Sequence, residues 1–482
     1  MIAISLLFYI LFGYILINYI LKFKKYGQGT LKGPTPVPLF GNILQIGLKP
    51  HEAFNNLHDK YGPVYRFWMG DLYTVVVNDV DILKKMYIDN SEIFLNHPDT
   101  PTNRYASNQY NDLAFAPPDL WREHRKLITN GLARNKLRNA YNSMDCKIER
   151  LLKSMKEYSK EGLPFEPHHH IQTTIMDILF GLIIHKQVKD YSDSKDFKHF
   201  TDCIAEVFEE MRKPAIGDYI TLFKPFLLLW YKYKFTLFDK LIVFFEREFQ
   251  QHRDTFKEEY RENPRDLLDS MISFYGEDQE KTLPMIYVCG ELLLAGIETT
   301  SSAIEWSFIF LANYPDIQQK VFDEIQSIVG RDKSLKLSHR PSTPFLNAFI
   351  KELLRIRTVS PYAIPRSCTE DIIIDGHFIP KGAQILPNQY GASLNSKHWD
   401  NPFEFNPSRF LSPQNNGFNL FGYGPRSCPG QSIAMDEIYL MVGNIIKLFK
   451  ISSVDGKLID DNVFFGFTFV PNRFSVTLVE RQ

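Results

Sequence analysis

The most informative stretch of the sequence is Phe421-Gly-Tyr-Gly-Pro-Arg-Ser-Cys-Pro-Gly430, which places one cysteine in a glycine-rich loop directly before a helical pattern. Pro429 suits the first turn of a helix, where its missing N–H is no loss. Cys428 is therefore expected at a helix N-terminus, where the macrodipole and free backbone N–H groups lower the pKa of a thiol. A glycine-rich loop also lets the backbone pass close to a flat, bulky group. Together these features predict a thiolate that serves as the axial ligand of a haem iron.

A buried structural cysteine in an ordinary turn is the alternative interpretation, and it would be the default for a lone cysteine beside a single glycine. Arg426 argues against it, because an arginine two residues before the cysteine could bind an anionic substituent of the same flat group. The number of suitable neighbours favours the haem ligand.

The same stretch resembles the signature F-x-x-G-x-R-x-C-x-G of the cytochrome P450 superfamily, the haem-thiolate monooxygenases. The matching residues are Phe421, Gly424, Arg426, Cys428 and Gly430, together with Ala434 as the small residue six positions after the cysteine. The resemblance extends over essentially the whole chain. It implies that these residues bind haem b, with Cys428 as the ligand of the metal.

Length and composition are compatible with one large globular domain. The chain has 482 residues and a formal net charge of -1, which argues against nucleic acid as its main partner. We find no internal repeat and no Gly/Ser-rich linker after the N-terminal region. The five cysteines are widely spaced and include no C-x-x-C pair, which indicates a reducing compartment without a disulfide framework.

The first 21 residues carry no charge and would form a helix of about 32 Å, long enough to cross a bilayer. Lys22, Lys24 and Lys25 follow, and basic residues stay on the cytosolic side of a membrane. A cleaved signal peptide is the rival interpretation, but the apolar run is long and no small-x-small cleavage site follows it. We therefore expect residues 1–21 to be a transmembrane anchor in the endoplasmic reticulum, with the catalytic domain in the cytosol.

Residues 22–42 combine the basic stop-transfer residues with the proline-rich stretch Lys32-Gly-Pro-Thr-Pro-Val-Pro38. Proline fixes φ and resists helix formation, so this stretch is expected to be a semi-rigid spacer. The haem domain would then comprise residues 43–482. In that domain, residues 64–70 and 74–77 are typical of short strands and residues 81–90 of a helix. Most of the remainder is helical, so the expected fold is mainly α with small β-sheets, resembling a single cytochrome P450 haem domain.

Residues 282–312 form the longest helical pattern, about 45 Å if continuous. The pattern is apolar nearly all round, which predicts a helix through the core. Glu291, Glu298 and Glu305 recur every seven residues on nearly one face, and a solvated stripe is the expectation for Glu291 or Glu305.

The central helix contains Ala295-Gly-Ile-Glu-Thr-Thr300, in which Gly296 costs about 1 kcal/mol of helix stability and favours a local widening of the turn. The stretch resembles the family pattern A/G-G-x-D/E-T. The resemblance implies that Gly296 and Thr299 border the dioxygen site, and that Glu298 with Thr299 delivers protons there through water.

Glu352 and Arg355 stand three residues apart, so they share one helix face and can pair. Such a pair contributes little on a surface. By the resemblance, Glu352, Arg355 and Arg409 form a buried structural cluster that locks the core behind the haem.

Haem propionates need cationic partners. Trp121 and Arg125 match the family's W-x-x-x-R, one turn apart on a helix, and Arg366 follows the helix that carries Arg355. The resemblance implies that Arg125, Arg366 and Arg426 bind the propionates.

No Rossmann or P-loop fingerprint occurs, so no bound flavin or nucleotide is expected on this chain. The resemblance implies electrons from NADPH through a separate flavoprotein reductase, with a cytochrome b-type donor as a second source. The segments expected on the distal side of the haem are mostly apolar or small and imply a hydrophobic small-molecule substrate; they are residues 104–115, 292–300, 359–364 and the neighbourhood of Gly466-Phe467.

Residues 223–233 include Phe226-Leu-Leu-Leu-Trp230, which would suit a second contact with the membrane surface. A buried core helix is the alternative for this segment.

The sequence thus predicts a membrane-anchored monooxygenase that inserts one atom of O2 into a hydrophobic compound and reduces the other to water. One alternative is a haem-thiolate isomerase or dehydratase that acts on a ready-made peroxide. The presence of Glu298 and Thr299 argues against this alternative. Another is a membrane-anchored haem-binding sensor or carrier, which has no need of a proton-delivery pair.

Overall fold

The computed structural model describes residues 2–27, 31–47, 49–132, 138–187, 204, 206–207, 215–233, 237–276, 278–412, 420–465 and 468–481. Gly466 and Phe467, expected near the distal side, lie outside these residues. The helices are α1 Ile2–Gly27, α2 Pro50–Tyr61, α3 Val80–Lys84, α4 Pro101–Ala106, α5 Pro118–Gly131, α6 Arg138–Glu161, α7 Pro167–Ile183, α9 Ile216–Tyr219, α10 Lys224–Tyr233, α11 Leu237–Asp254, α12 Leu267–Tyr275, α13 Thr282–Asn313, α14 Pro315–Val329, α15 Pro344–Ile356, α16 Gln389–Ser393 and α17 Gln431–Leu448.

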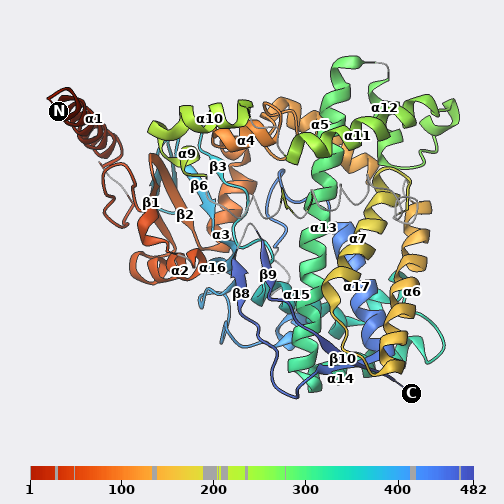
Figure 1. The fold of residues 1–482 in the computed structure, drawn as a ribbon. Helices are drawn as coiled ribbons and strands as arrows, with labels where there is room; N and C mark the ends of the chain where they lie inside the picture. Colours follow the sequence, from red (N-terminus) through yellow and green to blue (C-terminus); the bar gives the residue numbers. More distant parts are fainter. Residues whose placement is uncertain are drawn as a thin grey trace.

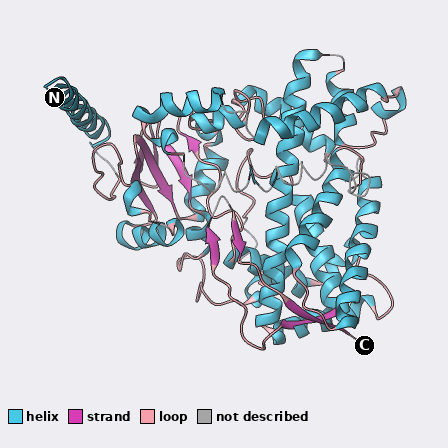
Figure 2. Cartoon of the chain, viewed as in Figure 1, coloured by secondary structure: helices cyan, strands magenta, loops and turns pink. Residues whose placement is uncertain are grey.

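The strands are short and form one four-stranded and three two-stranded sheets in the described part of the chain. Figure 1 and Figure 2 show the helices gathered in one large body, with the four-stranded sheet on the side from which α1 projects. The prediction of a mainly α fold with small sheets is confirmed. The strands are β1 Val64–Met69, β2 Leu72–Val77, β3 Arg366–Ser367, β4 Ile372–Ile374, β5 His377–Ile379, β6 Gln384–Pro387, β7 Phe449–Ser453, β8 Val463–Phe465, β9 Phe469–Pro471 and β10 Val476–Glu480.

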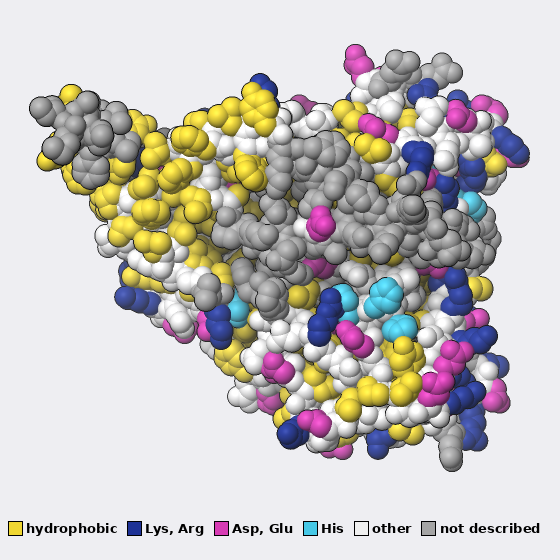
Figure 3. Space-filling model, in the orientation of Figure 1, with side chains coloured by type: hydrophobic (Ala, Val, Ile, Leu, Met, Phe, Trp, Pro, Cys, Tyr) yellow, Lys and Arg dark blue, Asp and Glu magenta, His cyan; other side chains and the backbone are white. Residues whose placement is uncertain are grey.

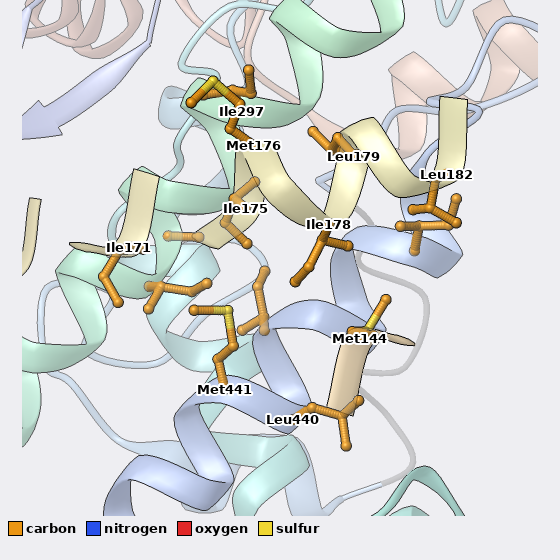
Figure 4. Close-up of a cluster of buried hydrophobic side chains, with 14 of the residues drawn as sticks. Met144, Ile171, Ile175, Met176, Ile178, Leu179, Leu182, Ile297, Leu440 and Met441 are labelled. Carbon is orange, nitrogen blue, oxygen red and sulfur yellow. The ribbon is translucent and has the colours of Figure 1, made fainter. Parts of the chain in front are cut away.

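The core is built around α13, which packs against α7, α11, α15 and α17. Figure 4 shows apolar side chains from four helices meeting beside it, with Met144 on α6, Ile175 on α7, Ile297 on α13 and Leu440 on α17. All four are buried. The predicted central helix is confirmed, because α13 runs unbroken from Thr282 to Asn313.

Among the described residues, α13 alone has the length and hydropathy of a membrane span. Its second half is buried almost without interruption, with Trp306, Phe308 and Phe310 at no more than 1 % exposed. Burial of this degree inside the helical body identifies α13 as the core helix of the domain. The N-terminal helix α1 continues to Gly27, beyond the expected end of the anchor at residue 21.

The expected solvated stripe on α13 is wrong for Glu305 and for Glu291. Glu305 is 4 % exposed, its Oε1 lies 2.9 Å from Nδ1 of His168, and burial raises the pKa of its carboxyl to about 8. Glu291 accepts a 2.8 Å hydrogen bond from the backbone N–H of Leu113. The seven-residue spacing did not indicate a solvated side, because other parts of the chain contact both Glu291 and Glu305.

The four-stranded sheet has the order β1-β2-β6-β3 and lies beside the N-terminal segments. β1 pairs antiparallel with β2, with Val64 opposite Val77, and β2 pairs in parallel with β6. Both predicted strands are therefore confirmed. The predicted helix over residues 81–90 is present as α3 and a following π-helical turn, Lys85–Asp89.

The proline-rich stretch lies against β1. The backbone N–H of Arg66 donates to the Lys32 carbonyl at 2.9 Å, and Asn42 exchanges hydrogen bonds with the backbone of Trp68 at 2.7 and 2.9 Å. A Cβ on Gly33 would lie 2.2 Å from the Arg66 carbonyl oxygen, so glycine permits the close approach. Residues 31–42 are thereby bonded to the edge of the sheet.

Candidate active site

The loop before α17 is shaped by two glycines in left-handed conformations, Gly422 at φ 84° and Gly424 at φ 72°. A Cβ on Gly424 would lie 1.7 Å from the carbonyl oxygen of Tyr87, so no other residue fits there. The N–H of Cys428 donates to the carbonyl of Phe421 at 2.8 Å and closes the loop. The sequence thus folds into a tight turn that ends with Cys428 before the first turn of α17.

The first turn of α17 begins at Gly430, whose carbonyl accepts a 2.9 Å hydrogen bond from the N–H of Ala434. A Cβ on Gly430 would lie 3.9 Å from Sγ of Cys428. Gly430 therefore leaves room beside the thiol.

Cys428 has an accessible side chain although it lies deep in the protein. Burial raises the pKa of its thiol, while the N–H groups of Gly430 and Gln431 and the charge of Arg125 lower it. The expected net lowering by the helix N-terminus is wrong for the chain alone, because burial outweighs it. A thiol that is deep and yet accessible faces an internal space, and a bound cation would be needed to hold it as a thiolate.

Three arginines converge on this loop. Arg125 donates to the carbonyl of Ser427 at 2.5 Å, and Arg366 donates to the carbonyl of Arg426 at 3.3 Å. Arg426 donates to the carbonyls of Ala114 at 3.0 Å and Ala116 at 2.5 Å. The guanidinium of Arg426 also lies 4.8 Å from the ring centroid of Trp121, a cation–π contact that joins the loop to α5.

These arginines are held mainly by neutral acceptors, although the carboxyls of Asp112 and Glu291 act on Arg426 and raise its pKa. In the part of the chain that the structure describes, none of Arg125, Arg366 and Arg426 forms an ion pair with a carboxylate. Burial lowers the pKa of Arg366 to about 10, and burial together with Arg366 lowers that of Arg426 to about 9. Nε of Arg426 is buried without a hydrogen-bond partner. Buried cations without anions are costly, so the donor set fits a group that carries two carboxylates.

The middle of α13 has one accessible face. Ala295 is exposed, and Leu292 and Thr299 are half-buried, although Leu293 and Ile297 beside them are fully buried. The hydroxyl of Thr299 donates to the carbonyl of Ala295 at 2.7 Å. Accessible residues inside a core helix indicate that this face, too, borders an internal space.

Glu298 is buried and Gly296 lies at the border of that face. Glu298 is 8 % exposed, and its Oε1 accepts a 2.8 Å hydrogen bond from the hydroxyl of Thr468. A Cβ on Gly296 would lie 2.8 Å from Cδ1 of Leu179, so the glycine lets α7 approach α13 closely. The expected widening of the turn is absent, since α13 is α-helical throughout.

Glu352, Arg355 and Arg409 are brought together as the sequence predicted. Arg355 binds both carboxylate oxygens of Glu352 at 2.7 and 2.8 Å, and Nε of Arg409 donates to Oε1 at 2.9 Å. Arg355 also donates to the carbonyls of Ser393 and Pro402 at 2.9 and 2.8 Å. The cluster thus ties α15 to the chain that leads toward the cysteine loop.

Sequence reasoning missed His97. Its Nδ1 lies 2.8 Å from the carbonyl of Pro365 and its Nε2 lies 2.9 Å from Nη1 of Arg366. The carbonyl needs a donor and Arg366 needs an acceptor, so the neutral ring carries its proton on Nδ1. Burial lowers the pKa of His97 well below its usual value, in agreement with that form. A single histidine between Asn96 and Pro98 gives no pattern by which this role could be found.

The chain matches the cytochrome P450 family over residues 31–478. It belongs to that family. Probable cytochrome P450 508A1 of Dictyostelium discoideum is 36% identical over 473 residues, covering 97% of each chain, and probable cytochrome P450 508A4 of the same organism is 34% identical over 490 residues with the same coverage. A solved zebrafish cytochrome P450 with progesterone has a TM-score of 0.78 at 26% identity and covers 90% of this chain and 100% of its own.

Membership makes this P450 a monooxygenase whose cofactor is haem b held by a cysteine thiolate. Enzymes of the family use O2, act on hydrophobic substrates and accept electrons from a redox partner. The accessible deep thiol and the three arginines, which form no ion pair within the described residues, suit such a cofactor, since haem presents an iron to a thiolate and two propionates to cations.

We predict that Glu352→Ala destabilises this P450 by about 3 to 5 kcal/mol, because it leaves Arg355 buried without its carboxylate. Chemical denaturation followed by circular dichroism measures the change. Glu52→Ala is the matched control, since Glu52 pairs with Lys49 at the same helical spacing but on the surface, at 54% and 66% exposed. Equal losses in the two variants would contradict the structural role of the cluster.

Proposed function

We propose that Cys428 is the axial ligand of the haem iron and that this P450 inserts one oxygen atom into a hydrophobic small molecule. The observation that carries the proposal is the accessible thiol of Cys428 at the N-terminus of α17, beside three half-buried arginines that form no ion pair within the described part of the chain. When bound, the haem supplies the centre at which dioxygen is reduced. The protein supplies the ligand, the counter-charges and the protons.

Two groups of residues would hold the cofactor. Phe421, Gly424, Gly430 and Ala434 shape the loop and the first turn of α17 around the thiol. Trp121 with the arginines forms the polar rim: Nε of Arg426 is a donor without a partner, and Arg125 and Arg366 bind only neutral acceptors. We assign the propionates to this rim.

Thr299 is the residue best placed to pass a proton toward the site. Its hydroxyl is half-buried on the accessible face of α13 and now donates to Ala295, so rotation about χ1 would turn its proton into the internal space. Glu298 immediately precedes Thr299 in the sequence, but its carboxylate accepts from the hydroxyl of Thr468. We propose that Glu298 reaches Thr299 through water, and that Gly296 acts by admitting Leu179 of α7 to this part of the helix.

The substrate is proposed to be apolar. The accessible residues of the central helix, Leu292, Ala295 and Thr299, offer one hydroxyl among hydrocarbon side chains. The structure of a zebrafish cytochrome P450 was solved with progesterone, which is a largely apolar compound. At 26% identity we propose only that the substrate is apolar, and we do not propose a particular compound.

We further propose that residues 1–21 anchor this P450 to the endoplasmic reticulum, with residues 22–42 as the connection and residues 43–482 as the cytosolic haem domain. The first 21 residues carry no charge, and Leu6, Tyr9 and Phe12 of α1 are 57% to 70% exposed. Relatives in the family are often membrane-associated.

A second contact with the membrane is proposed at α10. The alternative of a buried core helix is wrong, because Phe226, Trp230 and Tyr233 are 68%, 55% and 78% exposed. Figure 3 shows hydrophobic side chains gathered on the side of the molecule from which α1 leaves the domain. Large exposed apolar patches of this kind mark interaction surfaces.

Electrons are proposed to come from NADPH through a separate flavoprotein reductase. The sequence contains neither a Rossmann nor a P-loop fingerprint. The family's dependence on a redox partner supports the same source.

We predict that the dithionite-reduced protein with carbon monoxide shows a strongly red-shifted Soret band, and that Cys428→His abolishes the shift because imidazole replaces the thiolate. Absorption spectroscopy of the purified proteins measures both. Cys289→Ser is the control, since that cysteine is buried elsewhere in α13. An unshifted band in folded wild type would refute the assignment of Cys428.

We predict that Thr299→Ala uncouples turnover, so that NADPH is consumed in reconstituted assays with a flavoprotein reductase while product falls by about 10-fold or more, in the range for loss of a proton donor. Parallel measurement of NADPH, O2 and product gives the coupling. Ser302→Ala, a buried hydroxyl on the same helix, is the control. Unchanged coupling would remove Thr299 from the mechanism, and product without reductase would remove the redox partner.

We predict that deletion of residues 2–21 moves the protein from the membrane fraction toward the soluble fraction, and that Trp230→Ser in the deleted chain releases the remainder. Flotation through a density gradient measures the distribution. Retention of the doubly altered chain at the wild-type level would overturn both membrane contacts.

A further inference from the structure

Residues 112–116 form a short segment that is held by hydrogen bonds from two side chains outside it, Glu291 and Arg426; we call it the clamped segment. Within it, Asp112 Oδ1 accepts a 3.1 Å hydrogen bond from the N–H of Phe115. Leu113 and Ala116 are buried, while Ala114 and Phe115 keep accessible surface. The segment therefore makes a compact turn that has both an inner and an accessible side.

Glu291 of α13 holds the segment from one side. Its Oε2 accepts from the N–H of Leu113 at 2.8 Å, and the N–H of Ala114 also donates to the carboxyl. Two consecutive backbone donors on one side chain fix both the position and the tilt of the segment.

Arg426 holds the segment from the other side, through its hydrogen bonds to the carbonyls of Ala114 and Ala116. The ring of Phe115 packs edge to face on His97 at 5.5 Å between centroids, and His97 is in turn bonded to Arg366. The segment is thereby connected to the same arginines that surround the cysteine loop.

The position of Glu291 gives this clamp a consequence for the active site. Glu291 precedes Ala295 by four residues, so it lies one helical turn from the accessible face that ends at Thr299. The side chain of Glu291 keeps some accessible surface although it lies deep in the protein, as the side chain of Cys428 does. We infer that Glu291, too, borders an internal space.

We propose that Glu291 is a positioning residue, which holds the clamped segment as a fixed wall of the substrate site and so determines how well a bulky ligand is held over the haem. The proposal rests on the proposed function for the haem and goes beyond it in naming the group that orders this wall.

The chemistry of Glu291 sets the choice of variants. Burial, followed by the nearby carboxyl of Asp112, raises the pKa of Glu291 and so favours its neutral form. A neutral carboxyl still accepts through its carbonyl oxygen, as the amide of glutamine does. Glu291→Gln therefore keeps the contact with the backbone, and Glu291→Ala removes it.

The first test is hydrogen exchange at the amides of Leu113 and Ala114. In Glu291→Ala exchange should accelerate by about tenfold, the effect of one lost hydrogen bond, and in Glu291→Gln it should stay near wild type. Glu305→Ala is the matched control, because Glu305 is another glutamate on α13 that binds His168 instead. Unchanged exchange in Glu291→Ala, or equal acceleration in Glu305→Ala, would overturn the clamp.

The second test compares two probes that bind haem iron through nitrogen, imidazole and 4-phenylimidazole, by optical titration. In Glu291→Ala the dissociation constant of 4-phenylimidazole should rise about two- to tenfold relative to that of imidazole, because only the phenyl group reaches the wall. Glu291→Gln and Glu305→Ala should retain the wild-type ratio. An unchanged ratio in Glu291→Ala would overturn the role in ligand positioning.

The two tests separate the two proposals. If wild type gives no optical shift with imidazole, the haem assignment fails, and the exchange measurement still decides whether Glu291 holds the segment. If imidazole binds normally and exchange is unchanged, the haem assignment stands and the clamp fails.

Discussion

The arrangement of this P450 depends on three half-buried arginines that form no ion pair within the described part of the chain. Arg125, Arg366 and Arg426 are held by neutral acceptors around the loop before α17, and no described carboxylate pairs with them. Burial lowers the pKa of each guanidinium, because its charge is less well solvated there than in water. A nearby anion would stabilise that charge. In the proposed arrangement the haem propionates would supply these anions, so binding the cofactor would contribute to the stability of the protein as well as to its chemistry.

Arg426 has a second role that links distant parts of the chain. It leaves the cysteine loop, stacks on Trp121 of α5 and bonds to the backbone of residues 114 and 116, which Glu291 of α13 holds from the opposite side. One side chain thus connects the cysteine loop with the clamped segment. If Arg426 binds a propionate as proposed, a change in that propionate would reach residues 114 and 116 through the same side chain.

The cysteine loop, the central helix and the Glu352 cluster could be predicted because each has a local pattern: glycines at fixed offsets, a long apolar run, and two charges one turn apart. His97, the clamp by Glu291 and the contact between Gly296 and Leu179 could not, because each depends on segments that meet only in the folded chain. The pKa of Cys428 shows the same limit. The helix N-terminus was visible in the sequence, whereas the burial that outweighs it was not.

The docking of residues 31–42 on β1 has a mechanical consequence. A proline-rich linker without contacts to the domain would leave the domain able to rotate relative to α1. Here Lys32 and Asn42 are hydrogen-bonded to the backbone of β1, so this stretch is held rigidly against the sheet. A force or torque applied along α1 would be transmitted directly to β1. The orientation of the domain would therefore follow the orientation of its N-terminal helix.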